Sequence, residues 1–252
     1  MIKILFGKCE HCASKNAADV MAEVIRNKPD AVLGLATGSS PIGMYKELIA
    51  RCKAGEITFK NIKSVNLDEY VGLTADHDQS YAYFMNTNLF DHVDIDKSNT
   101  NLPNGVAADP VAECERYDAV IESMGGVDIQ LLGIGNNGHI GFNEPDDNFT
   151  KGTGLVNLTD STIDANSRFF ASRDLVPTQA LSMGVGQIMK AKKILLIALG
   201  KGKAQILEKS LFGPVTPAVP ASILQFHPDV TVCADEAALS LILEKHPEAV
   251  TK

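Results

Sequence analysis

The segment Val127–Asn137 reads VDIQLLGIGNN, and it decides the fold class. An apolar run of strand length passes directly into a glycine-rich loop, which is typical of a buried parallel strand with a ligand site beyond its carboxyl end. We therefore predict a strand over Val127–Gly133. Similar runs rich in Val, Ile or Leu predict further parallel strands at Ile2–Phe6, Ala31–Ala36, Ile62–Leu67, Ile194–Leu199 and Val230–Ala234.

Longer segments with helical periodicity lie between these runs. The alternation predicts an open, mostly parallel, Rossmann-like three-layer α/β/α sandwich, in one domain over residues 1–252. Residues 143–178 are too polar for a core strand and too long for a simple connection, so we predict a lid there. Residues 247–252 are expected to fray. The predicted helices are Ser14–Asn27, Pro41–Ala54, Gln79–Phe90, Pro110–Met124, Ser182–Lys190, Lys203–Leu211 and Glu236–Lys245.

Charge and cysteine content narrow the class of protein. The chain has 23 Lys and Arg against 31 Asp and Glu, a net charge of −8, which argues against nucleic acid or an anionic membrane as partner. No signal peptide or membrane span is evident, and five scattered cysteines do not form a disulfide framework, so we expect a cytoplasmic protein. Cys9–Cys12 (CEHC) has metal-like spacing but lacks a second pair, and we expect ordinary thiols and no metal.

Polar groups follow the second predicted strand. In Thr37-Gly38-Ser39-Ser40-Pro41 we expect Ser40 to be a helix N-cap and Pro41 to occupy the first helical turn. Two interpretations stay open, because a glycine turn with hydroxyls and free N–H groups serves as a helix cap or as a phosphate site. No Gly-Lys-Ser/Thr follows, so the loop is not that of a nucleotide hydrolase.

Acid–base candidates follow the third and fourth predicted strands. Asp68 is a candidate base at a strand end; the alternative is that it caps a turn while Glu69 is solvated. His139 lies in a glycine-rich loop, and Glu144 comes five residues later, where it could orient the imidazole, so we predict catalysis there. Positive charge for an anion is expected from Arg168 and from Lys203, with Lys201 as an alternative.

Four motifs contain the candidate residues at the strand ends. They are Leu67-Asp68-Glu69-Tyr70, Gly138-His139-Ile140-Gly141-Phe142-Asn143-Glu144-Pro145, Ala165-Asn166-Ser167-Arg168-Phe169-Phe170 and Leu199-Gly200-Lys201-Gly202-Lys203-Ala204. Together they resemble the glucosamine-6-phosphate deaminase family. The resemblance extends in order from the Thr37–Ser39 loop to Leu224–Pro228. It implies conversion of D-glucosamine 6-phosphate and water to D-fructose 6-phosphate and ammonia, with no metal or organic cofactor.

The resemblance also implies roles for single residues. Asp68 would move the proton between C2 and C1, and His139, held by Glu144, would open the pyranose ring. Asn137 stands where some members of the family carry Asp in the ring-opening relay. An amide can orient His139 but cannot accept a proton as a carboxylate does. The 6-phosphate would be bound by Thr37, Gly38, Ser39, Ser40, Arg168 and Lys203.

Two other functions remain as alternatives, a 6-phosphogluconolactonase and a sugar-phosphate sensor without turnover. The only partner we expect is the small amino-sugar phosphate, bound by a monomer or small homo-oligomer. Relatives activated by N-acetylglucosamine 6-phosphate carry basic residues after the Asn-Glu-Pro motif. Here Lys151–Asn157 reads KGTGLVN, so we expect weak or absent activation.

Overall fold

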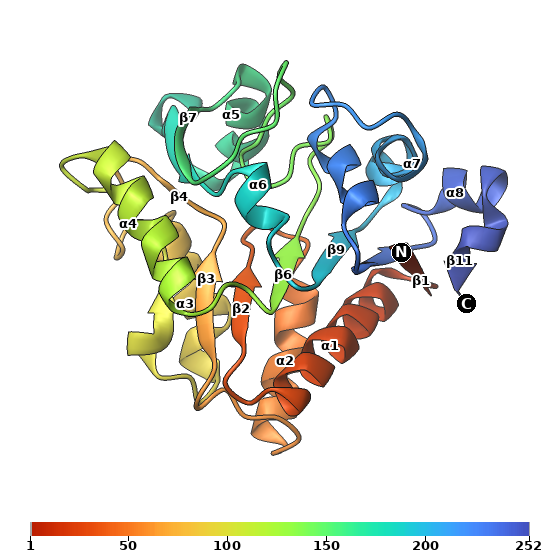
Figure 1. Ribbon diagram of the computed structural model, residues 1–252, viewed down its shortest axis with the longest axis horizontal. Coiled ribbons are helices and arrows are strands. Elements are labelled where there is room, and N and C mark those ends of the chain that lie inside the picture. The colour runs from red at the N-terminus through yellow and green to blue at the C-terminus, as the bar shows by residue number, and fades with distance from the viewer. Residues whose placement is uncertain (1, 252) are drawn as a thin grey trace.

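A computed structural model describes residues 2–251, apart from the side chain of Ala165, and centres on an eight-stranded sheet (Figure 1). All neighbouring strands in this sheet are parallel, as predicted. All six predicted strands belong to it. From edge to edge the order is β11 (Val250–Thr251), β1 (Ile2–Gly7), β10 (Val230–Asp235), β9 (Ile194–Ala198), β6 (Ile129–Leu132), β2 (Val32–Leu35), β3 (Lys63–Asn66) and β5 (Thr100–Asn101).

Helices cover both faces of the sheet. Connections that run from β1 towards β5 pass through α1 (Glu10–Asn27), α2 (Ile42–Lys53) and α3 (Tyr81–Asn88), which pack in sequence on one face. Connections that run from β5 towards β11 place their helices on the other face, because crossovers between parallel strands are right-handed. The predicted three-layer fold is therefore confirmed. The helices of that second face are α4 (Pro110–Ser123), α6 (Val185–Ile188), α7 (Ala204–Phe212) and α8 (Ser240–Lys245).

Short 3₁₀ turns link several of these elements. The turns are η1 (Phe90–His92), η2 (Lys97–Asn99), η3 (Ser167–Phe169), η4 (Arg173–Leu175), η5 (Lys201–Lys203), η6 (Pro220–Phe226) and η7 (Pro247–Ala249). Within residues 2–251, no helix combines the length and the apolar character needed to cross a membrane.

Two buried tyrosines fix the strand ends that precede the candidate site. The Tyr45 hydroxyl donates to the Ala36 carbonyl at 2.6 Å and accepts from the Ala36 N–H at 3.3 Å, which ties α2 to the end of β2. The Tyr117 hydroxyl likewise donates to the Asn66 carbonyl at 2.7 Å and accepts from its N–H at 2.9 Å. The hydroxyls thus satisfy backbone groups of Ala36 and Asn66 and hold both strand ends in place.

A second, antiparallel sheet lies beyond the carboxyl ends of the main strands (Figure 1). It consists of β4 (Asp68–Tyr70), β8 (Gln179–Ser182) and β7 (Gly154–Asn157), and α5 (Asp160–Asn166) follows β7. The predicted lid segment, residues 143–178, thus carries a strand that its polarity did not suggest. This sheet and the neighbouring loops have their own hydrophobic cluster, formed by Tyr70, Phe142, Leu158, Ile163, Val176 and Ala180.

Three local predictions were wrong. Ser40 is not an N-cap, since α2 begins at Ile42 with Pro41 in the cap position and no side-chain bond. The chain end is not frayed up to Thr251, because Val250 and Thr251 pair with β1; Lys252 lies outside the described residues. The helix predicted over Ser182–Lys190 is reduced to α6, because Ser182 ends β8.

Candidate active site

The candidate site lies where the strand order reverses. From β2 the chain adds β3 and β5 on one side and then crosses to β6 on the other side. Loops that follow β2 and β6 therefore diverge above the sheet and leave a crevice, the usual ligand site of an open parallel sheet. A cavity of about 740 Å³ occupies this position. It is within the size range of small-molecule sites.

The cavity brings together predicted residues that are far apart in the sequence. They come from the ends of β2, β3, β6 and β9 and from the segment after β7. Glu144 does not line the cavity but lies behind His139. The predicted residues that line it are Thr37, Gly38, Ser39, Ser40, Asp68, Asn137, His139, Arg168 and Lys203.

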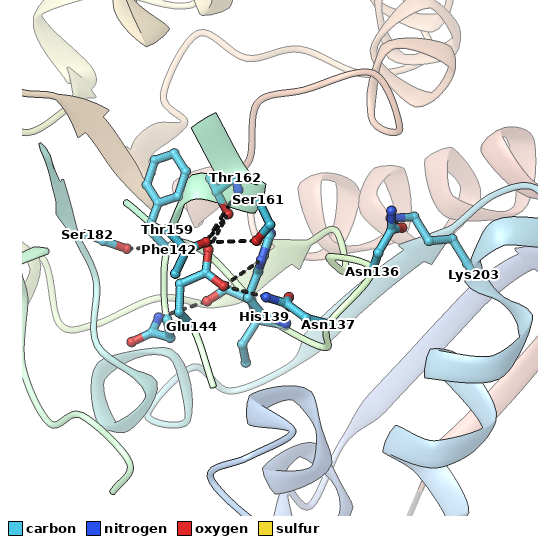
Figure 2. Close-up of polar contacts among 12 residues, drawn as sticks. Asn136, Asn137, His139, Phe142, Glu144, Thr159, Ser161, Thr162, Ser182 and Lys203 are labelled. Atoms are coloured by element: carbon cyan, nitrogen blue, oxygen red, sulfur yellow. Dashed lines mark hydrogen bonds and ion pairs between the residues drawn. The ribbon is translucent and has the colours of Figure 1, made fainter. Parts of the chain in front are cut away.

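His139 is supported from behind by a carboxylate (Figure 2). Its Nδ1 lies 3.5 Å from Oε2 of Glu144, and the two side chains are 25% and 12% exposed. That separation is an electrostatic contact, longer than an ordinary hydrogen bond. The Asn137 side-chain amide donates to the same Oε2 at 2.5 Å, and its Oδ1 accepts the backbone N–H of His139 at 3.2 Å. The Thr162 hydroxyl donates to the other oxygen of Glu144.

These contacts keep Glu144 ionised. Burial alone would raise the pKa of this carboxyl, but His139, Thr162 and Asn137 lower it to about 2. A fixed negative charge beside an imidazole stabilises its protonated form. The imidazole itself faces the cavity, where it can take and return a proton.

Glycines allow the imidazole to lie against the loop. A Cβ atom at Gly135 would collide with the His139 ring, and Gly138 has a φ of +90°, which favours glycine. The glycine-rich loop therefore serves this histidine as well as the turn after β6.

Asp68 is the buried acid of the site. It is 7% exposed, lines the cavity and has no hydrogen bond to its carboxylate among residues 2–251. Burial, with a contribution from Glu69, raises its pKa to about 8. Such a carboxyl can lose or gain a proton near neutral pH.

Glu69 has a structural role. It is buried, and its oxygens accept the N–H groups of Tyr70, Tyr81 and Ala82, each at 2.9 Å, so it fixes the start of α3. The alternative of a turn-capping Asp68 beside a solvated Glu69 is therefore wrong. Adjacent side chains of a strand point to opposite sides, which separates the two carboxyls.

The burial of Asp68 predicts that the stability difference between Asp68→Asn and the unchanged protein depends on pH. Between about pH 4 and pH 8 the folded chain holds a proton that the unfolded chain has lost, so the free energy of unfolding falls as pH rises through this window. Asp68→Asn removes that titration. Urea unfolding midpoints of the variant and of the unchanged protein are measured at pH 5 and at pH 8. We expect the difference, variant minus unchanged protein, to be larger at pH 8. A constant difference would contradict the raised pKa.

The other end of the cavity is suited to an anion. Within the described chain, the hydroxyls of Thr37, Ser39 and Ser40 line the cavity without any hydrogen-bond partner. The Lys203 ammonium donates to Oδ1 of Asn136 at 2.7 Å (Figure 2), and Arg168 lies over the Phe169 ring at 4.7 Å. Lys201, the alternative to Lys203, does not line the cavity.

The two cations of this end affect each other. Burial, and then the positive charge of Arg168, lower the pKa of Lys203. Two like charges facing one cavity are stabilised by a doubly charged anion between them, and a phosphate group has that charge.

Arg168 offers a direct test of the anion end. Arg168→Ala is expected to raise KM for a sugar phosphate about tenfold or more, because a charge-assisted hydrogen bond contributes about 1.5–3 kcal/mol. Steady-state kinetics measure this, with kcat changing much less. Arg26→Ala, at the exposed end of α1, is the matched control. An unchanged KM for Arg168→Ala would place the phosphate elsewhere.

Several lining residues were missed by the sequence analysis. Tyr81 and Ser161 line the cavity, Asn166 donates from Nδ2 to the Tyr70 hydroxyl at 2.9 Å, and Thr162 supports Glu144. Asn166 falls within the Ala165–Phe170 motif, but nothing in the sequence pattern marks Thr162.

Comparison with known proteins gives a consistent result. Residues 8–233 match the family model described as glucosamine-6-phosphate isomerases/6-phosphogluconolactonase. A glucosamine-6-phosphate deaminase of Clostridium perfringens is 57% identical over 229 residues, 91% of this chain and 95% of that protein. One of Clostridioides difficile is 51% identical over 244 residues, 97% and 98% of the two chains.

Solved structures agree with this. A monomeric glucosamine-6-phosphate deaminase superposes with a TM-score of 0.93 at 47% identity, over 95% of this chain and 99% of that one. A 6-phosphogluconolactonase of Trypanosoma brucei has a TM-score of 0.76 at 15% identity, over 96% and 99%, and shares the fold. The chain therefore belongs to the family of glucosamine-6-phosphate isomerases and 6-phosphogluconolactonases.

Proposed function

We propose that the protein converts D-glucosamine 6-phosphate and water to D-fructose 6-phosphate and ammonia. One observation carries the proposal: a single cavity holds a buried carboxyl, an imidazole backed by a carboxylate, and two cations. The names of the curated relatives at 51–58% identity support the same reaction.

Phosphate binding comes first and orients the sugar. Arg168, Lys203 and the hydroxyls after β2 hold the 6-phosphate, at a distance from the reacting carbons. Binding energy gained there is available to place C1 and C2 beside the acid–base groups.

Ring opening is the task of His139. The imidazole takes the proton of the anomeric hydroxyl and returns a proton to the ring oxygen, which releases the open-chain aldehyde. Glu144 stabilises the imidazolium formed between these transfers. Asn137 holds both partners in place, and as an amide it carries no proton in the relay.

Isomerisation and deamination follow on the open chain. Asp68 as carboxylate removes the proton from C2 while O1 takes a proton from solvent, and an enolamine forms between C1 and C2. The same acid returns its proton to C1, which leaves a protonated imine at C2. Water adds to this carbon and the nitrogen leaves as ammonium, the protonated form of the ammonia product, giving the 2-ketose. Electrons and atoms balance without an external oxidant, and no step calls for a metal ion.

The segment 143–178 would act as the lid of this site. It supplies Thr162, Asn166 and Arg168, so its closure on the sugar would assemble both ends of the cavity. We also propose one cytoplasmic domain that works as a monomer or small homo-oligomer, without nucleic-acid or membrane partners. The relative of 47% identity is monomeric.

One assay tests the function directly. Purified protein, with a chelator present, is given glucosamine 6-phosphate, and ammonia and fructose 6-phosphate are measured together; we expect equal amounts of both. Lactone hydrolysis is measured in parallel with 6-phosphogluconolactone. Lactone turnover without ammonia would replace the proposal by the lactonase function. Binding without turnover of either compound would favour a sensor.

Activation by N-acetylglucosamine 6-phosphate is proposed to be weak or absent. Kinetics without that compound are then hyperbolic and change little when it is added. Sigmoidal kinetics that the compound abolishes would contradict this.

A further inference from the structure

Two cysteines meet at the start of α1, beyond the carboxyl end of β1. The Sγ atoms of Cys9 and Cys12 lie 2.9 Å apart, and Cys9 is the N-cap of the helix, its sulfur accepting the Cys12 N–H at 3.3 Å. Cys9 is exposed and Cys12 is partly exposed. Small molecules in solution therefore have access to the pair.

Cys9 and Cys12 do not fit a metal site. No group of three or more His, Cys, Asp or Glu side chains that could hold a metal occurs between residues 2 and 251. His11, between the two cysteines, has a 73% exposed side chain whose Nδ1 lies 3.8 Å from Glu47. The pair thus remains a dithiol.

The two sulfurs differ in chemical character. Hydrogen bonds from the Cys12 thiol and the Cys12 N–H lower the pKa of Cys9. The thiol contact with Cys9, together with desolvation, raises the pKa of Cys12. A low-pKa thiol at a helix N-terminus with a second thiol beside it is the arrangement of an attacking and a resolving cysteine.

We propose that Cys9 and Cys12 form a redox-active site that closes reversibly into a disulfide by exchange with small-molecule disulfides. The Cys9 thiolate attacks one sulfur of the small disulfide, whose S–S bond breaks and releases a first thiol. Cys12 loses its proton and attacks the Cys9 sulfur, which releases the second thiol. Two protein thiols are oxidised and one small disulfide is reduced.

Little movement is needed for this reaction. The sulfurs have to approach from 2.9 Å to the bond length of about 2.05 Å, and both already lie in one helical turn. The other three cysteines offer no such pair, because Cys114 and Cys233 are buried and Cys52 donates to Asp94.

The site shares a loop with the substrate cavity. Glu10, between the two cysteines, lines the cavity. A Cβ atom at Gly7 would collide with Ala13, so the end of β1 packs tightly on the first turn of α1. The disulfide therefore forms at the rim of the cavity, in a segment whose backbone is already fixed.

Intact mass and peptide mapping after treatment of the reduced full chain with glutathione disulfide test the proposal. We expect the unchanged protein to lose two hydrogen atoms, with an internal disulfide in the peptide that contains residues 9–12, and dithiothreitol to reverse it. Cys9→Ser and Cys12→Ser cannot close the disulfide, and Cys12→Ser should retain one glutathione on Cys9. Ser is a favoured N-cap, so Cys9→Ser keeps the cap of α1.

Cys52→Ser is the matched control and should behave as the unchanged protein. A peptide 9–12 that stays fully reduced, or that carries glutathione on both cysteines, would overturn the proposal. So would a Cys12→Ser protein that acquires no glutathione on Cys9.

Discussion

Asp68→Asn is expected to lower kcat by about a hundred- to ten-thousandfold, with little change in KM for glucosamine 6-phosphate. The amide has nearly the size of the carboxyl, so the cavity and the phosphate contacts persist. It cannot take a proton from C2, and Glu69 cannot substitute, because backbone N–H groups hold its oxygens away from the site.

Steady-state ammonia release measures this effect. The matched control is Asp91→Asn, which changes an exposed carboxylate paired with Lys97 and should leave kcat unchanged. In the unchanged enzyme, the logarithm of kcat/KM should rise with pH up to about 8, because the base must be ionised and its pKa lies near that value. A near-normal rate for Asp68→Asn would remove this residue from the mechanism.

His139→Asn is expected to lower kcat/KM by a similar hundred- to ten-thousandfold, because ring opening then has no proton carrier. Glu144→Gln should lose less, about ten- to a hundredfold, since it removes only the charge that supports the imidazole. In Glu144→Gln, the new side-chain amide can still accept the Thr162 hydroxyl through its oxygen. The Asn137 amide, which donates to the other oxygen of Glu144, then meets either a weaker acceptor or an NH2 group.

The two variants are compared with the unchanged enzyme by steady-state ammonia release at one pH. His92→Asn, at an exposed histidine that bonds to the Thr87 carbonyl, is the control and should retain full activity. Full activity of His139→Asn would leave the proposed ring opening without its group.

The parallel sheet was predictable because its strands are short apolar runs. β6 and β9 are buried along their whole length; β9 is entirely apolar and β6 departs from this only at Gln130, so the apolar runs are visible in the sequence. The convergence of Asp68 and His139 was predictable for the same reason, since carboxyl ends of parallel strands share an edge.

The antiparallel sheet was not predictable in this way. β4 reads Asp-Glu-Tyr and β7 reads Gly-Leu-Val-Asn. Neither sequence alternates apolar with polar residues, which is the pattern that predicts a half-buried strand. Both form because β8, more than twenty residues after β7, pairs with each of them. Thr162 was missed because its partner, Glu144, is set by that pairing and not by sequence spacing.

The small antiparallel sheet and its own hydrophobic cluster give the cavity two structurally separate walls. The wall built on the main sheet is locked by Tyr45 and Tyr117, whereas the wall with Thr162 and Arg168 depends on a cluster of few side chains. Amide protons of β7 should consequently exchange with solvent through partial opening, at a lower free energy than those of β6. Substrate entry would then require only local opening of the wall that contains β7, while the global fold stays intact.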